Sequence, residues 1–249
     1  MQMFKSDWDE YQAIILAGGF GTRVKHLLGG LPKPMAQVNG APFLHWVIKS
    51  LLMQGLKHVA LSTHYQARLI EKFISNDFKD QNIKCIEEPS PQGTAGGVIF
   101  VKNALESQNS ACKAKFLVLN GDSLIAGDFS RAAEMLADDI DCVILGVQTS
   151  NTDRYGRLII DENYNLLSFE EKMSGAGIIN AGVYLIRASV FEKYQGCKTP
   201  ISFEYDIFPK MITDNKKIKV FLMKCPFIDI GTESSLANAS QFVREYLNG

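Results

Sequence analysis

The stretch Ala13-Ile-Ile-Leu-Ala-Gly-Gly-Phe-Gly-Thr-Arg23 decides how the rest of the chain is interpreted. It opens with an apolar run that ends in glycines, which indicates a buried strand leading into a loop. Three glycines allow backbone N–H groups to approach an anion closely, so the loop is suited to hold phosphate. The G-G-x-G spacing fits neither a Walker A loop nor the dinucleotide fingerprint.

Two cations accompany this loop. Arg23 ends it, and Lys33 follows within Leu31-Pro-Lys-Pro34. A guanidinium can hold a phosphate with two hydrogen bonds, and a lysine supplies a mobile point charge. The combination predicts a triphosphate site; the alternative is an ordinary glycine-rich turn with solvated charges.

The rest of the chain alternates short β-type runs with amphipathic stretches. We expect strands at 13–17, 58–62, 83–87, 116–119 and 142–147, and helices at 42–54, 67–76, 94–106 and 130–137. This alternation predicts an α/β fold with a mainly parallel sheet and helices on both faces, the strand ends lying along one edge. Strand-like runs at 157–160, 166–169 and 178–186 then indicate an antiparallel β extension, and 233–247 a closing helix. We expect one domain over 1–249, divided into 12–149, 150–232 and 233–249.

Composition excludes several classes of protein. The chain has 249 residues, 46% apolar and 21% charged, with a formal net charge of −1. These fractions are typical of a globular domain, and the near-zero charge argues against a nucleic-acid partner. No apolar run approaches the roughly 18 residues of a membrane span, and residues 1–10 do not resemble a signal peptide. The five scattered cysteines predict neither a disulfide framework nor a zinc site. We expect a soluble cytoplasmic protein without membrane contact.

Two aspartates are candidate metal ligands. Asp122 ends the run 116–122, where a predicted strand leads into a loop, and Asp229 follows the short apolar run 226–228. Mg²⁺ prefers one or two carboxylates together with substrate and water oxygens. The pair predicts a magnesium site if the two segments are adjacent, whereas each aspartate alone would be read as a turn or capping residue.

An ordered set of motifs resembles the sugar-1-phosphate nucleotidylyltransferases, from about residue 12 to 230. After the glycine loop and Pro32-Lys-Pro34 come segments 93–97 (GTAGG), 120–122 (NGD), 169–172 (FEEK), 180–184 (NAGVY) and 229–231 (DIG). Segments 153–156 (DRYG) and 168–172 (SFEEK) resemble the D-glycero-D-manno-heptose 1-phosphate guanylyltransferase branch, and mannose-1-phosphate guanylyltransferases look similar. The resemblance implies a Rossmann-like, nucleotide-diphospho-sugar transferase-like fold. It also implies transfer of NMP from an NTP to a sugar 1-phosphate with release of pyrophosphate.

The resemblance assigns roles residue by residue. Arg23 and Lys33 become the catalytic cations, Mg²⁺ the cofactor, and Asp122 and Asp229 its ligands. Nucleotide contacts fall on Leu16, Ala17, Gly18, Gly19, Gly21, Thr22, Glu88, Gly93 and Thr94, within the half 12–149. Sugar-phosphate contacts fall on Tyr155, Gly156, Glu171, Lys172, Asn180 and Gly182, within the half 150–232. No Ser-His-Asp arrangement is needed, because the attacking phosphate oxygen is already ionised.

Glu88 favours guanine as the base. It closes a strand just before segment 89–94, which resembles the base-binding segment of the family. Guanine presents N1–H and N2–H₂ side by side, and a carboxylate accepts both, whereas thymine and uracil offer one N–H flanked by carbonyl oxygens. GTP and a sugar 1-phosphate are therefore the expected partners. A solvated glutamate is the alternative.

Other functions stay open. A mannose 1-phosphate guanylyltransferase and a glucose 1-phosphate uridylyl- or thymidylyltransferase share the motifs. A glycosyltransferase would usually show Asp-x-Asp where this chain has Gly121-Asp-Ser123, and a non-catalytic regulatory subunit would not need every charged motif residue. Family members with a C-terminal β-helix are longer, so we expect no acyltransferase activity. A homodimer is compatible with the sequence, which leaves the oligomeric state open.

Overall fold

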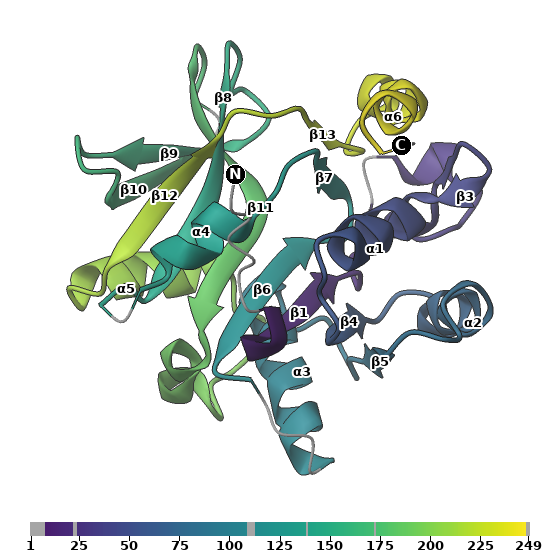
Figure 1. Cartoon of the computed structure of the whole chain (residues 1–249), viewed down its shortest axis with the longest axis horizontal. Helices are drawn as coiled ribbons and strands as arrows, with labels where there is room; N and C mark the ends of the chain where they lie inside the picture. The colour runs from purple at the N-terminus through teal and green to yellow at the C-terminus, as the bar shows by residue number, and fades with distance from the viewer. Residues whose placement is uncertain (1–7, 22–23, 109–112, 138, 172, 248–249) are drawn as a thin grey trace.

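The computed structural model describes residues 8–21, 24–108, 113–137, 139–171 and 173–247. A nine-stranded mixed sheet runs through it (Figure 1). Its centre is parallel: β1 (Tyr11–Leu16) lies between β4 (Val59–Thr63) and β6 (Lys115–Asn120), and β5 (Ile83–Glu87) pairs with β4. The carboxyl ends of these strands therefore lie along one edge, as the sequence predicts.

Antiparallel strands complete the sheet. The long β11 (Gly177–Arg187) pairs with β6, β8 (Cys142–Thr149) and β9 (Gly156–Ile160), and β10 (Leu166–Glu171) pairs with β9. The antiparallel extension is thus continuous with the parallel strands through β11. The α/β architecture with helices on both faces is confirmed.

The neighbours of β8 do not follow from the β-α alternation. The strand runs in the same direction as β6, but it pairs with β11 in the antiparallel direction and with β12 (Ile218–Met223) in the parallel direction. The reason is that β11 takes the position beside β6 that β8 would otherwise occupy. Such long-range pairing leaves no local signal in the sequence.

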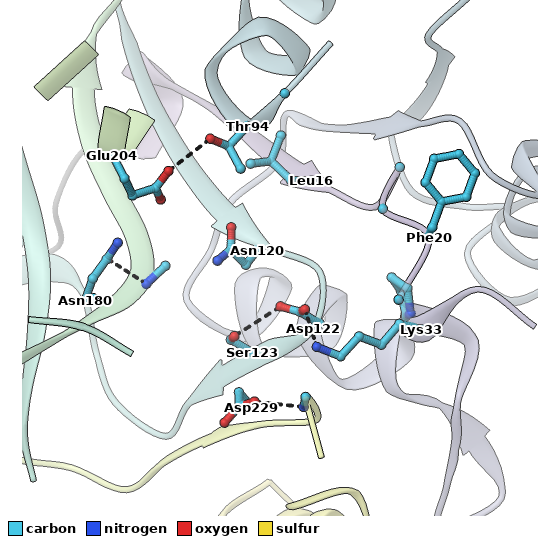
Figure 2. A pocket seen from close by; sticks show the side chains of 18 of the residues that line it. Leu16, Phe20, Lys33, Thr94, Asn120, Asp122, Ser123, Asn180, Glu204 and Asp229 are labelled. Atoms are coloured by element: carbon cyan, nitrogen blue, oxygen red, sulfur yellow. Dashed lines mark hydrogen bonds and ion pairs between the residues drawn. The ribbon is translucent and has the colours of Figure 1, made fainter. Parts of the chain in front are cut away.

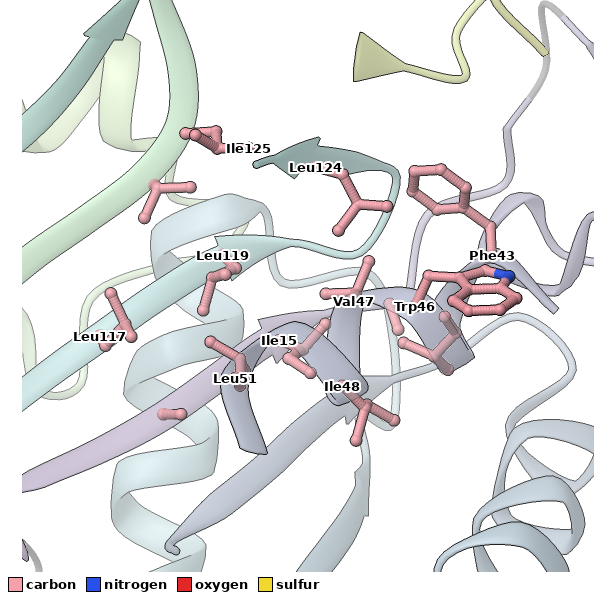
Figure 3. Packing of buried hydrophobic residues seen from close by; sticks show 14 of the residues in the cluster. Ile15, Phe43, Trp46, Val47, Ile48, Leu51, Leu117, Leu119, Leu124 and Ile125 are labelled. Carbon is pink, nitrogen blue, oxygen red and sulfur yellow. The ribbon is translucent and has the colours of Figure 1, made fainter. Parts of the chain in front are cut away.

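Alternating side chains of the buried strands divide the core between two faces. On one face Ile15 and Leu117 pack against α1 (Phe43–Met53), as Figure 3 shows. The same core includes residues of α2 (Ala67–Asp77), α4 (Ser130–Met135) and α6 (Glu233–Tyr246). On the other face Ile14 and Val118 pack with α3 (Thr94–Ser107) and α5 (Phe208–Thr213). Helices on both faces leave the strand-end edge as the place for a site.

The remaining elements are short. They comprise β2 (Gln37–Val38), β3 (Ala41–Pro42), and the 3₁₀ turns η1 (Trp8–Glu10), η2 (Lys25–Leu27), η3 (Lys33–Met35) and η4 (Ala188–Tyr194). A single π-helical segment, η5 (Phe203–Ile207), precedes α5. Single π turns are frequent at functional sites.

A separate two-stranded sheet lies beyond the end of β6. β7 (Ser123–Ile125) pairs antiparallel with β13 (Phe227–Asp229), with Ser123 opposite Asp229. Ile230 also donates its N–H to the Asp122 carbonyl at 3.0 Å. This pairing brings together two segments that are about a hundred positions apart in the chain. Among the described residues, no helix has both the length and the apolar composition needed to cross a membrane.

Candidate functional site

A cavity of about 600 Å³ opens at the strand-end edge, between the parallel centre and the antiparallel extension (Figure 2). A volume in this range is typical of a small-molecule site. Most of the motif residues expected from the sequence line it: Leu16, Gly18, Gly19, Gly21, Lys33, Glu88, Gly93, Thr94, Asp122, Tyr155, Gly156, Asn180, Gly182 and Asp229.

Some expected residues are not placed in this cavity. Ala17 is fully buried, and its N–H is bonded to the Ser62 carbonyl at 2.8 Å. Thr22, Arg23 and Lys172 lie outside the described residues, as does the side chain of Glu171. Their expected roles remain predictions from the sequence.

Lys33 reaches from η3 to the end of β6. Its Nζ donates to Oδ2 of Asp122 at 2.6 Å, and the lysine side chain is only 14% exposed. The Ser123 hydroxyl donates to the other oxygen of Asp122 at 3.2 Å. A largely buried cation beside the glycine loop therefore faces the cavity and is held there by one of the two candidate metal ligands.

Asp229 ends β13 and is held by donors from two segments. The Gly231 N–H donates to Oδ1 at 2.7 Å, and Nη2 of Arg154 lies 3.2 Å from Oδ1 and 3.0 Å from Oδ2. The Tyr155 hydroxyl donates to Oδ2. Burial, together with this carboxylate, raises the pKa of Tyr155 well above its usual value, so the phenol keeps its proton at neutral pH.

The two aspartates fit a magnesium ion that is shared with a ligand. Asp229 ends β13, Asp122 immediately precedes its partner strand β7, both line one cavity, and each is paired with a protein cation. Among the described residues there is no group of three or more histidines, cysteines or carboxylates that could hold a metal ion alone. Mg²⁺ commonly takes one or two carboxylates and completes its coordination with phosphate and water oxygens. The donor set therefore suits Mg²⁺ bound together with a phosphate ligand.

Glu88 is a buried residue of the cavity lining, with 6% of its surface exposed. Oε1 accepts from the Ser62 hydroxyl at 2.5 Å, and Oε2 accepts from the Gln92 N–H at 2.8 Å. A Cβ at Gly97 would lie 2.9 Å from both Oε1 and the Ser62 hydroxyl, so this helical glycine makes room for the pair. The carboxylate is fixed by two donors and still has free acceptor positions.

A chain of hydrogen bonds links the cavity residues of β11 to Glu204. Asn180 accepts from the Gly182 N–H at 2.9 Å and donates to the Tyr184 hydroxyl at 2.7 Å. Tyr184 in turn donates to Oε1 of Glu204 at 3.0 Å. Gly182 has φ +69°, and a Cβ there would lie 2.2 Å from the Asn120 amide, so no larger residue fits.

Glu204 ties this chain of hydrogen bonds to the start of α3. Its Oε2 accepts from the Ser202 hydroxyl at 2.7 Å and from the Thr94 hydroxyl at 3.3 Å, as Figure 2 shows for Thr94. The Phe203 N–H donates to the same threonine at 3.0 Å. The π-helical segment η5 therefore joins the two sides of the cavity.

Several residues of the site are absent from the expectations. Arg154 lies in segment 153–156 (DRYG), so the sequence could have indicated a third cation in the site. Tyr184 lies in the 180–184 motif and is fully buried, yet its hydroxyl connects two cavity residues. Glu204 follows no motif and reaches the cavity only through η5. No periodic or motif signal marks it.

Comparisons with known proteins agree over most of the chain. A sequence profile of the Nucleotidyl transferase family matches residues 12–246. The chain is 34% identical over 225 residues to the D-glycero-alpha-D-manno-heptose 1-phosphate guanylyltransferase of Campylobacter jejuni, covering 88% of this chain and 94% of that protein. The enzyme of the same name from Aneurinibacillus thermoaerophilus is 31% identical over 238 residues, covering 95% and 100%.

A solved structure is similar in fold and sequence. The crystal structure of HddC from Yersinia pseudotuberculosis, complexed with GMP-PN, superposes with a TM-score of 0.79 at 35% identity, covering 93% of this chain and 99% of that one.

Proposed function

This chain belongs to the Nucleotidyl transferase family and is a nucleotidyltransferase; from that premise we propose that it transfers GMP from GTP to D-glycero-α-D-manno-heptose 1-phosphate. The products are GDP-heptose and pyrophosphate. One observation carries the proposal: Lys33, Asp122 and Asp229 meet the Asn180–Gly182 segment in a single cavity. Two phosphorylated substrates can therefore be brought together there.

The chain's own residues act by positioning and by charge. An oxygen of the sugar 1-phosphate is already ionised, so no base has to remove a proton before it attacks the α-phosphorus of GTP. Catalysis then consists of alignment for in-line displacement and neutralisation of the charge on the leaving pyrophosphate. Lys33 supplies one cation from within the cavity wall, and Arg23 supplies the second from the end of the glycine loop.

Asp122 and Asp229 are the residues that would hold Mg²⁺. When bound, the ion would supply positive charge that neutralises the charge developing on the phosphates. Tyr155 keeps Asp229 oriented through its hydroxyl, and Ser123 does the same for Asp122. Both carboxylates are therefore fixed in direction before any ligand arrives.

Guanine selection is assigned to Glu88. The carboxylate is buried and held by Ser62 and the Gln92 N–H, so its remaining acceptor positions are fixed in space. These positions suit the N1–H and N2–H₂ donors of guanine, while a pyrimidine would place a carbonyl oxygen against a buried carboxylate. The names of the similar enzymes from Campylobacter and Aneurinibacillus support the same base and the heptose.

The division of labour follows the sequence halves. Residues 12–149 supply the glycine loop, Lys33, Glu88, Thr94 and Asp122, and residues 150–232 supply the sugar side. In that half Tyr155, Gly156, Asn180 and Gly182 line the cavity, and Glu171 and Lys172 are assigned to the sugar hydroxyls and phosphate from the sequence. The closing helix assigned to the remaining segment corresponds to α6 (Glu233–Tyr246), which packs against β13.

The proposal is tested by pyrophosphate release across a matrix of substrates. GTP, ATP, UTP, CTP and dTTP are each combined with heptose, mannose and glucose 1-phosphates, and kcat/KM is measured. We expect the highest value for GTP with the heptose 1-phosphate. A higher value with mannose 1-phosphate would replace the sugar assignment, and a preferred pyrimidine nucleotide would overturn the guanine assignment.

A further inference from the structure

Every acceptor position of the Asp229 carboxylate is occupied by a donor of the protein. Oδ1 receives the Gly231 N–H and the Arg154 guanidinium, and Oδ2 receives the same guanidinium and the Tyr155 hydroxyl. An ionised carboxylate offers about four lone-pair sites in total. A divalent cation can therefore reach Asp229 only if one of these donors leaves.

Arg154 is the donor that can leave. The Gly231 N–H belongs to the backbone next to β13, and Tyr155 is fixed by its contact with the Phe227 ring. The Arg154 side chain, by contrast, is 40% exposed, whereas the Asp229 side chain is only 14% exposed. Arg154 also lines the main cavity, so it can release Asp229 and still remain in the site.

The charges explain when this release is favourable. Lys33 neutralises Asp122, and Arg154 neutralises Asp229. A bare divalent ion would add positive charge to a cluster that is already balanced. A triphosphate adds negative charge, and phosphate oxygens are bidentate partners for a guanidinium. The nucleotide therefore offers Arg154 an alternative partner at the moment when Asp229 is needed.

We infer that Arg154 keeps divalent cations away from Asp229 until the nucleotide triphosphate is bound, so that metal binding becomes conditional on the nucleotide. The inference rests on the metal site of the proposed function. Arg154 is a positioning residue here, because it acts through the carboxylate and not on the reacting atoms. Its effect is on the equilibrium affinity for divalent cations, which can be measured without turnover.

The test measures Mn²⁺ binding by electron paramagnetic resonance, with and without the α,β-methylene analogue of GTP, which cannot be cleaved at the reacting bond. In the wild type we expect weak binding of Mn²⁺ alone and much tighter binding with the analogue. In Arg154→Gln we expect Mn²⁺ alone to bind about tenfold more tightly, and the enhancement by the analogue to shrink by the same factor, since coupling is reciprocal. Arg131→Gln, an equal charge change at an exposed position of α4, should behave as the wild type.

A double-mutant cycle separates this exclusion from a general field effect. In an Asp229→Asn background, Arg154→Gln should change Mn²⁺ affinity by less than about twofold, whereas in an Asp122→Asn background its effect should persist. Unchanged Mn²⁺ affinity in Arg154→Gln, or an equal gain in the Asp229→Asn background, would overturn the inference. Failure of the proposed function would appear separately, as absent GTP turnover in the wild type.

Discussion

The two sides of the cavity are built in different ways. The nucleotide wall (Leu16, Gly18, Lys33, Glu88 and Asp122) comes from the end of β1, from the loops that follow β1, β5 and β6, and from η3. The sugar wall (Tyr155, Asn180, Gly182 and Glu204) is assembled from antiparallel strands and a π-helical segment. Parallel strand ends gather charged groups at one edge by topology alone, whereas the sugar wall depends on a chain of side-chain hydrogen bonds.

This difference predicts which kinetic constant changes when a residue of each wall is substituted. The nucleotide wall supplies charge at the reacting phosphates, so its variants should lower kcat. The sugar wall supplies orientation, so its variants should first raise the KM of the sugar 1-phosphate. The two kinds of loss separate kinetically, because KM effects report uniform binding and kcat effects report the transition state.

The largest effect is expected where the walls meet, at the two carboxylates. Asp122→Asn and Asp229→Asn should each lower kcat by about three orders of magnitude, since a metal ion contributes several kcal/mol of charge stabilisation. Steady-state kinetics with a Mg²⁺ titration measure the loss. Asp80→Asn, at an exposed turn, serves as the matched control. Normal Mg²⁺-dependent turnover in both site variants would reject the metal assignment.

Next come the cations of the nucleotide wall. Lys33→Ala and Arg23→Ala should each lower kcat by roughly two orders of magnitude or more, the scale of one preorganised charge donor. Thermal unfolding should confirm that each variant is folded. If only KM rose in either variant, that residue would be a binding contact and would not act in the transition state.

Glu88 tests the specificity of the nucleotide wall. Leaving a buried polar group unpaired costs about 1–3 kcal/mol, so GTP should be favoured over pyrimidine nucleotides by roughly tenfold to a hundredfold. Glu88→Gln should reduce this ratio of kcat/KM values. The variant should fold, because the Gln92 N–H can donate to the amide oxygen while the Ser62 hydroxyl accepts from the amide NH₂ and donates to the Gly97 carbonyl, which lies 3.4 Å away. An unchanged ratio would leave guanine as the base and remove Glu88 from its recognition.

The smallest expected effect concerns the sugar wall. Tyr184→Phe removes the hydroxyl between Asn180 and Glu204. The KM of the sugar 1-phosphate should rise about tenfold with the KM of GTP unchanged, and the free energy of unfolding should fall by about 1–3 kcal/mol because two half-buried partners each lose a hydrogen bond. Tyr164→Phe, on an exposed side chain at the turn between β9 and β10, provides a comparison for the loss of a hydroxyl. Equal changes in both KM values would remove the distinction between the walls.

The nucleotide wall can be predicted from the sequence more completely than the sugar wall, for a physical reason. The glycine loop, Lys33 and Asp122 all sit next to short apolar runs, so periodicity and glycine punctuation are enough to place them at one edge. Even Asp229, far along the chain, could be paired with Asp122 because two carboxylates after apolar runs suit one metal ion.

Other features depend on contacts that leave no local pattern. The insertion of β11 beside β6, which displaces β8, follows from long-range strand pairing. The hydrogen bond from Ser62 to Glu88 requires a small residue at position 97, which lies on α3. Glu204 reaches the cavity because a π turn bends the chain across the start of α3. Such contacts depend on the assembled fold.

The central claim is that both walls hold their phosphates in one cavity, so that the sugar 1-phosphate attacks the α-phosphorus of GTP directly. Turnover of a single diastereomer of GTP carrying sulfur on the α-phosphate, analysed by ³¹P NMR of the nucleotide-sugar product, tests this most directly. One in-line displacement predicts inverted configuration at phosphorus. Retained configuration would require two displacements through a covalent enzyme intermediate and would contradict the account.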